Sequence, residues 1–261
     1  MKILVEAPLN QLSLGNVSYN IIKELIGKGH DVGIFPLGEV DVGVYKKDRD
    51  LLSKLQNSID SRFDFLSDDI PALKIWHING SENKKNANQY LYSFYECNQP
   101  TEIETKLCEH QSQTIFSSSY ASNAFNQAYV PLGIDPDFHR NDKKYLEGVV
   151  HFGLMGKFEK RKHTSKIISS WAKKYGNNNK YQLTCCINNP FFKQEEMRSL
   201  ITNAVNGQNY TNINFLPFMP SNEDVNDFIN SIDIDLGGLS GAEGWNLPSF
   251  NATCLGKWSV V

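Results

Sequence analysis

Four cations gather directly after a short apolar run in the second half of the chain. The segment reads Gly153-Leu-Met-Gly-Lys-Phe-Glu-Lys-Arg-Lys-His163, with positive charges at Lys157, Lys160, Arg161 and Lys162. The run before it suits a buried parallel strand, and ligands of open α/β sheets bind at the carboxyl ends of such strands. Clustered cations there predict an anionic ligand such as a diphosphate. A solvated charged loop explains the lysines about equally well. A Walker A loop is excluded, because Phe158 follows Lys157 and the glycine spacing is absent.

A glycine-rich loop later in the chain carries a single acid. It reads Leu236-Gly-Gly-Leu-Ser-Gly-Ala-Glu-Gly-Trp-Asn-Leu-Pro248, and the acid is Glu243. Its glycines allow backbone amides to approach a ligand closely, and Asn246 or Pro248 can open a helix whose amino end favours phosphate. Because a carboxylate beside phosphate is unfavourable, we expect Glu243 to face hydroxyl groups such as those of a sugar. A tight strand-to-helix turn explains the glycines but not Glu243.

The apolar pattern predicts alternating strands and helices in both halves of the chain. Residues 2–7 form a strand, a helix follows with Val17, Ile21 and Leu25 on one face and Asn16 as its cap, and 31–35 form a second strand. The first half also contains a helix at 47–60, strands at 72–76, 89–95 and 114–117, and an exposed polar loop at 80–89. The second half has strands at 148–154, 181–187, 213–217, 232–236 and 258–261, and helices at 164–175, 194–205, 222–231 and 248–255. This is the α/β pattern of two Rossmann-like domains.

Two prolines and a glycine in Val130–Pro136, followed by a charged stretch, predict a domain boundary near residue 140. The domains would span 1–140 and 141–261. The net charge of -3 and the pI near 6.1 leave no overall positive field for nucleic acid. Five cysteines without metal-type spacing indicate reduced thiols, and no apolar run reaches the length of a membrane-spanning helix. We therefore expect a cytoplasmic protein with no nucleic-acid partner and no transmembrane segment.

Taken together, these segments resemble the retaining nucleotide-sugar glycosyltransferases of family 4 (glycosyl transferases group 1), which have the two-domain GT-B fold. The family's diphosphate motif, a glycine and a cation followed five residues later by a lysine, matches Gly156, Lys157 and Lys162. Glu243–Pro248 resembles the start of its acidic motif. Leu14–Ser18, Lys28–Val32 and Val130–Asp135 are similar to its first glycine loop, its helix-to-strand junction and its interdomain signature. The resemblance spans essentially the whole chain.

The resemblance implies a donor site in the second domain and an acceptor-side first domain. The partners would be a nucleotide-diphosphate sugar and a hydroxyl acceptor on a glycan, lipid or protein, with no metal or other cofactor. Glu243, Lys157 and Lys162 would be catalytic. Donor-binding positions would be Gly15, Gly156, Arg161, Gly241, Gly244, Asn246, Leu247 and Asn251. His77 and Glu96 are candidate acceptor or sugar contacts, although a surface histidine and a capping or surface acid explain them as well.

Two positions depart from the family pattern. Asn251 stands where the family has a second glutamate, eight residues after Glu243, that binds the ribose. Losing a charge-assisted contact there weakens donor binding by about 1–2 kcal/mol. Lys157 replaces a common arginine and gives up the planar fork. Asn251 thus leaves open an alternative, a catalytically weakened or non-catalytic nucleotide-sugar-binding or scaffold protein derived from this family.

Two further features complete the predictions. Asp233-Ile-Asp235 matches the DxD pattern of metal-dependent glycosyltransferases, but its place in an apolar strand favours a structural role. The family continues beyond Trp258-Ser-Val-Val261 with more helices. We therefore expect an incomplete outer layer of the second domain, exposed apolar surface near this terminus and a weaker hold between the domains.

Overall fold

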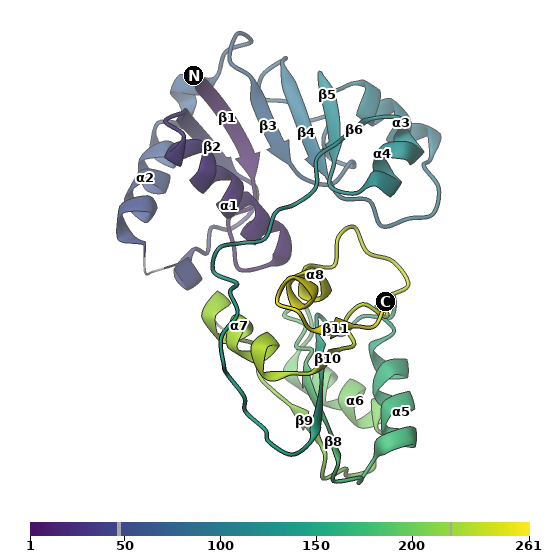
Figure 1. Cartoon of the computed structure of the whole chain (residues 1–261). Coiled ribbons are helices and arrows are strands. Elements are labelled where there is room, and N and C mark those ends of the chain that lie inside the picture. Colours follow the sequence, from purple (N-terminus) through teal and green to yellow (C-terminus); the bar gives the residue numbers. More distant parts are fainter. Residues whose placement is uncertain (46–47, 220) are drawn as a thin grey trace. The chain divides into compact units, whose positions relative to one another are not determined.

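The computed structural model describes residues 1–45, 48–219 and 221–261, and the chain divides into two compact units, Met1–Gly133 and Ile134–Val261. Each unit contains one sheet whose strand pairs are all parallel, with helices packed against it (Figure 1). No helix among the described residues is long and apolar enough to cross a bilayer.

The first unit has a six-stranded sheet in the order β2-β1-β3-β4-β5-β6. Its strands are β1 (Lys2–Ala7), β2 (Asp31–Pro36), β3 (Ala72–Ile75), β4 (Gln89–Ser93), β5 (Gln113–Phe116) and β6 (Ala128–Tyr129). Its helices are α1 (Ser13–Gly27), α2 (Arg49–Asp60), α3 (Glu102–Glu109) and α4 (Ser119–Phe125), with 3-10 turns η1 (Gly43–Tyr45) and η2 (Arg62–Phe65). Lys47, which opened the predicted helix 47–60, lies outside the described residues, and α2 begins after Asp48, whose carboxylate accepts the Leu51 N–H at 3.1 Å.

The start of the first helix differs from the prediction. Helix α1 begins at Ser13, so the prediction that Asn16 caps it was wrong: Asn16 lies inside the helix and accepts the Tyr45 hydroxyl at 2.7 Å. Gly15 also lies inside the helix, where a Cβ atom would stand 2.3 Å from the Asn10 carbonyl oxygen. The absent side chain is therefore what lets the chain fold back against the first turn of α1.

Two other segments of the first unit were misjudged. The sequence reading omitted α3, although Thr101 and Glu104 form a reciprocal capping box at its start. The loop at 80–89 is only partly exposed, because Asn86 is buried and donates to the carbonyls of Phe65 and Ile70 at 3.0 and 2.9 Å. Local polarity did not reveal these tertiary hydrogen bonds.

The second unit has a five-stranded sheet in the order β11-β10-β7-β8-β9. Its strands are β7 (Val150–Met155), β8 (Tyr181–Cys186), β9 (Ile213–Phe215), β10 (Ile234–Asp235) and β11 (Trp258–Ser259). Its helices are α5 (Thr164–Tyr175), α6 (Gln194–Ala204), α7 (Asn222–Ser231) and α8 (Leu247–Cys254). These nine elements occur where the apolar pattern predicts them: α5 and α7 have the predicted bounds, and the ends of the others differ by one or two residues.

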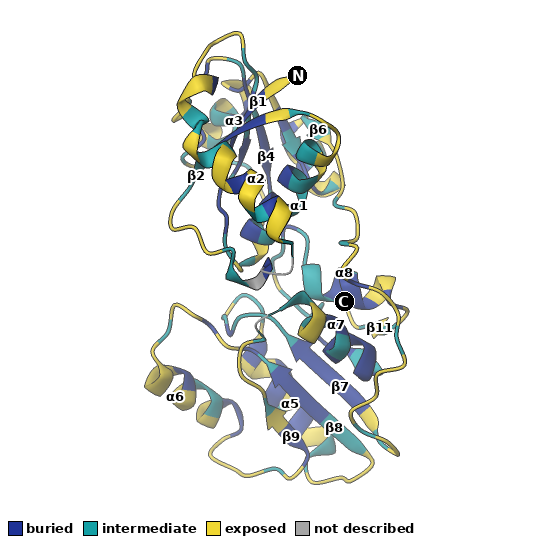
Figure 2. Cartoon of the chain, turned by 90° about the vertical axis from the view of Figure 1, so that its left-hand side faces the viewer, coloured by how far each residue is buried: buried dark blue, intermediate teal, exposed yellow. Residues whose placement is uncertain are grey.

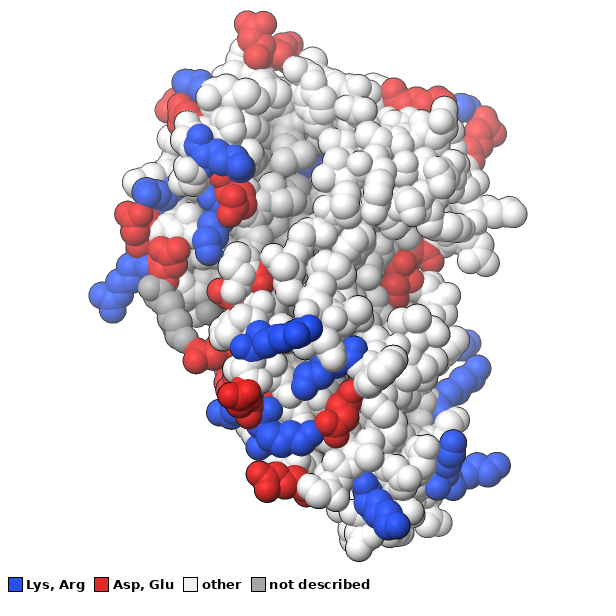
Figure 3. All heavy atoms as spheres, viewed as in Figure 1, with Lys and Arg blue, Asp and Glu red and all other residues white. Residues whose placement is uncertain are grey.

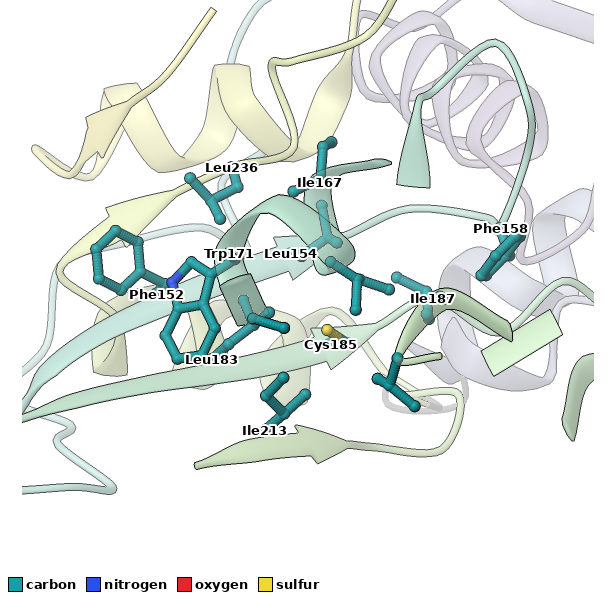
Figure 4. Close-up of a cluster of buried hydrophobic side chains, with 14 of the residues drawn as sticks. Phe152, Leu154, Phe158, Ile167, Trp171, Leu183, Cys185, Ile187, Ile213 and Leu236 are labelled. Carbon is teal, nitrogen blue, oxygen red and sulfur yellow. The ribbon is translucent and has the colours of Figure 1, made fainter. Parts of the chain in front are cut away.

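Apolar side chains cover both faces of this second sheet. One cluster joins the strands to α5 and α6; Figure 4 shows Phe152 and Trp171 at one end of it and Phe158 and Ile187 at the other. A separate cluster contains Phe228 and Ile229 of α7 and Ala252 of α8. Buried strands and exposed outer sides of helices are visible in Figure 2. The expected exposed apolar surface near the end of the chain is present: Trp258 on the edge strand β11 is 80% exposed, and Val261 beyond that strand is 89% exposed.

The second unit begins at Ile134, before the expected boundary at residue 140, because the segment after it is bound to α7. The His139 N–H donates to Asn226 Oδ1 at 3.0 Å, and the Asn141 N–H donates to Asn230 Oδ1 at 3.1 Å. Phe138 is buried in the cluster around Phe228. These contacts hold the charged stretch against the second sheet's helical layer.

Candidate functional site

The basic loop after β7 is anchored by one buried residue in its middle. Phe158 is only 6% exposed, and its N–H donates to the Ile187 carbonyl at the end of β8 at 2.9 Å. Its ring fills the end of the core cluster (Figure 4). Gly156, with a φ of 132°, provides the sharp turn out of the strand. The neighbouring side chains of Lys157 and Arg161 therefore remain about one-third exposed on a fixed backbone.

The glycine loop after β10 lies against this basic loop. The Gly241 N–H donates to the Arg161 carbonyl at 2.7 Å, and Arg161 Nη1 donates to the Ala242 carbonyl at 2.6 Å. A Cβ atom on Gly241 would stand 3.0 Å from His163 Nε2 and 3.1 Å from the Arg161 carbonyl oxygen, so a side chain here would crowd the junction of the two loops. Because β7 and β10 are neighbours in the sheet, their carboxyl-end loops meet although about eighty residues separate them.

Where the two loops meet, the acid of the glycine loop forms ion pairs with cations of the basic loop. Glu243 is paired with Lys162, and its Oε2 lies 3.4 Å from Arg161 Nη1. The Lys162 and Glu243 side chains are 15% and 16% exposed, so their interaction is only partly screened by solvent. An anion that approaches Lys162 must therefore compete with the Glu243 carboxylate for this ammonium group, or share the group with it.

A second acid, which the sequence reading passed over, joins the cluster. Glu159 accepts Lys157 Nζ at 3.2 Å through Oε1 and lies 2.9 Å from Arg161 Nε through Oε2. The feature of the sequence that could have identified Glu159 as part of the site is its position inside the basic run. Three cations thus face two carboxylates, which leaves a small local positive excess. On the face drawn in Figure 3, cations and acids lie interspersed among large uncharged areas. Lys160, the fourth cation of the run, is exposed.

The amino end of α8 closes the glycine loop. Asn246 has a left-handed φ of 59°, donates to the Gly237 carbonyl at 2.8 Å and accepts the Ser249 N–H at 3.4 Å. Leu247 is the first helical residue and Gly244 is buried just before it. Helix amino ends carry unsatisfied N–H groups and a partial positive charge, which favour an anion. Asn251, about one turn along the same helix, is 7% exposed.

Both acids of the Asp233-Ile-Asp235 pattern bind groups of the protein itself. Asp235 is buried and accepts the hydroxyls of Ser249 and Ser259, each at 2.6 Å. Asp233 accepts the His151 N–H at 2.8 Å and Lys144 Nζ at 2.6 Å. Within the described residues, no three His, Cys, Asp or Glu side chains are grouped as metal ligands would be. The pair fastens α8, β11 and the β7 start to β10, which is a structural role.

The remaining candidates lie in the first unit. His77 follows β3 as an exposed side chain, with its ring 5.4 Å from that of Trp76 in an edge-on arrangement. Glu96 is exposed after β4. Gly15 has the packing role against Asn10 described above.

Comparison with known proteins identifies the fold of the chain. No protein-family profile and no curated protein matches the sequence. Among solved structures, sucrose-phosphate synthase from Thermosynechococcus elongatus matches with a TM-score of 0.69 and 10% identity over 99% of this chain and 80% of its own. HepE from Anabaena, in complex with UDP-glucose, matches with a TM-score of 0.65 and 12% identity over 99% and 79%. Alpha,alpha-trehalose 6-phosphate synthase from Burkholderia multivorans gives 0.63 and 11% over 97% and 79%. At such identities the likeness concerns the fold, and this chain has the GT-B fold, built of two Rossmann-like domains.

Proposed function

We propose that the chain is a glycosyltransferase that takes its sugar from a nucleotide-diphosphate donor bound to the second unit. One observation carries the proposal: Lys162 and Arg161 converge on Glu243 where the loops after β7 and β10 meet. Cations suited to a diphosphate and an acid suited to sugar hydroxyls thus share one site, in a chain with the GT-B fold.

In this proposal the cations stabilise the leaving group. When the bond between the anomeric carbon and the phosphate oxygen breaks, negative charge develops on the diphosphate, and Lys157, Arg161 and Lys162 face it from one preorganised loop. Such stabilisation is often the largest single contribution to catalysis. The partial positive charge at the amino end of α8 adds to it. Because these groups can supply the neutralisation, we propose a reaction that needs no divalent metal.

Glu243 would orient the sugar by accepting hydrogen bonds from its hydroxyls, with Gly241, Gly244 and Asn246 shaping the loop around it. An acceptor hydroxyl on a glycan, lipid or protein would attack the anomeric carbon with retention of configuration, and its proton would pass to the departing diphosphate oxygen. The first unit, with His77 and Glu96, would provide the acceptor side. We expect the reaction in the cytoplasm, where nucleotide sugars are available.

A binding screen tests this proposal. Isothermal titration with UDP, GDP, ADP and their glucose or mannose conjugates should show micromolar to millimolar binding for at least one base, and a bound ligand raises the unfolding temperature by mass action. Absence of binding for every nucleotide would reject the proposal. Product analysis with the preferred donor, with and without EDTA and with NMR of the anomeric configuration, then tests metal independence and retention.

Asn251 favours one alternative, a nucleotide-sugar-binding or scaffold protein without full activity. A neutral, largely buried amide stands on α8 where the family has a ribose-binding glutamate. Donor binding without turnover, or turnover that rises in Asn251→Glu, would favour this alternative. Unchanged turnover in Asn251→Glu would show that the position does not limit activity.

A further inference from the structure

A phenylalanine next to the basic loop is exposed to an unusual degree. Phe191 follows β8 and is 70% exposed, whereas its neighbour Phe192 packs against the core of the second unit. The Lys157 ammonium lies 5.1 Å from the centre of the Phe191 ring. An isolated exposed phenylalanine is ordinary on a protein surface. This one lies directly beside the cations that face the proposed diphosphate.

The backbone that carries Phe191 is fixed by a hydrogen-bonded turn. The Phe192 N–H donates to the Asn189 carbonyl at 3.1 Å, and the Phe191 N–H donates to Asn189 Oδ1 at 3.0 Å. Pro190 occupies the second position of the turn, where its ring restricts φ. Phe191 is thus held at the tip of a rigid turn, so little backbone entropy is lost when a ligand binds to its ring.

The same turn is tied to the basic loop. Asn189 is 4% exposed, and its Nδ2 donates to the Phe158 carbonyl at 3.1 Å. The Gly156 N–H donates to the Cys186 carbonyl at 3.1 Å. These bonds set the spacing between the loops after β7 and β8 and hold the Phe191 ring beside Lys157. Lys157 in turn shares Glu159 with Arg161, so these contacts run from the Phe191 ring through Lys157 to the cations near Glu243.

We propose that Phe191 is the stacking platform for the base of the donor nucleotide, with Lys157 between the base and the diphosphate. The inference rests on the proposed function and extends it to the base. An aromatic face beside a cation binds a planar heteroaromatic ring by stacking, and such stacking tolerates different bases. The base is therefore held by its ring, and the phosphates are held by Lys157, Arg161 and Lys162.

Titration calorimetry with and without the base tests the proposal. The proteins are the full chain, Phe191→Ala, Phe191→Trp and the control Phe63→Ala, which removes a phenylalanine that is 60% exposed in the first unit. The ligands are UDP, GDP, ADP and inorganic pyrophosphate. We expect Phe191→Ala to weaken the best nucleotide by roughly 5- to 100-fold, the range of base–aromatic stacking, and pyrophosphate by less than twofold. The nucleotide affinities of Phe191→Trp and Phe63→Ala should stay within about threefold of that of the unchanged chain, because both variants keep an aromatic ring at position 191.

Several outcomes would overturn this inference. One is an unchanged nucleotide affinity in Phe191→Ala. Another is an equal loss of nucleotide and pyrophosphate affinity in Phe191→Ala, which would mean that Phe191 only positions Lys157. The third is a loss of nucleotide affinity in Phe191→Trp as large as that in Phe191→Ala. If the unchanged chain binds no nucleotide at all, the proposed function fails and the base platform fails with it. Tight nucleotide binding that ignores Phe191 rejects the platform alone.

Discussion

Replacing Glu243 by glutamine should raise the affinity for UDP while impairing use of the sugar nucleotide. In the free protein, Glu243 neutralises Lys162 and approaches Arg161 at 3.4 Å. The isosteric amide removes the negative charge but leaves the loop its shape and hydrogen-bonding capacity. Both cations then become available to the diphosphate, and the repulsion between carboxylate and phosphate disappears.

The size of the effect follows from the carboxylate charge that the substitution removes. A carboxylate and a phosphate that share one cation lie about 6 Å apart, and two unit charges at that distance repel by about 3 kcal/mol at an effective dielectric constant of 20. Glu243 is 16% exposed, so solvent reduces this value, and we take about 1–2 kcal/mol, which is a 5- to 30-fold gain in UDP affinity. UDP-glucose gains the same relief but loses hydrogen bonds from its hydroxyls to a carboxylate, about 1.5–3 kcal/mol. Its affinity should therefore rise less than that of UDP, or fall.

The assay is calorimetric titration of UDP, pyrophosphate and UDP-glucose at two salt concentrations, with Glu159→Gln as the matched control. Glu159 also pairs with two cations of the basic loop, Lys157 and Arg161, so its replacement should tighten UDP and UDP-glucose by the same factor. If Glu243→Gln weakens UDP and pyrophosphate, the charge argument is refuted. If both variants shift UDP and UDP-glucose alike, Glu243 does not contact the sugar.

Four other substitutions test three separate parts of the structure. Lys162→Ala should weaken pyrophosphate binding by at least about tenfold, since a charge-assisted contact is worth about 1.5–3 kcal/mol. Asp233→Asn removes no such contact to the ligand, so pyrophosphate affinity should stay within about twofold. The reverse result in calorimetric titrations would favour a metal-dependent site. Gly15→Ala should lower the free energy of unfolding by about 2–3 kcal/mol, a typical overpacking cost, because its Cβ would meet the Asn10 carbonyl at 2.3 Å; an unchanged denaturation midpoint would contradict this. Burial lowers the pKa of His151 in the folded protein below its ordinary value of about 6.5. As the pH falls, the histidine of the unfolded chain is therefore protonated before that of the folded chain. The free energy of unfolding then decreases from about pH 6.5 down to the pKa of His151 in the folded protein. In His151→Asn this part of the pH dependence should be absent from urea melts between pH 7 and 5.

Much of the fold was predictable because its elements are defined by local patterns. The second unit follows the apolar periodicity element by element, and α5 has the predicted bounds, 164–175. The first unit was predicted less well. Helix α1 starts at Ser13, before Asn16, and Asn10 lies close against Gly15 in its first turn, an approach that the capping preference of Asn16 does not reveal. Helix α3 was omitted although its capping box was readable in the sequence.

The candidate site divides in the same way. Local sequence by itself identified the basic run, the glycine loop with its single acid, and the apolar strands before them, because each is a property of neighbouring residues. Only the tertiary structure joined Glu243 to Lys162, assigned Asp235 to two serine hydroxyls and placed Phe191 beside Lys157. Those pairings depend on the order of strands in the second sheet, where β10 lies beside β7 and β8 lies on its other side. Strand order is set by packing between segments far apart in the chain, and no local pattern encodes which loops it will bring together.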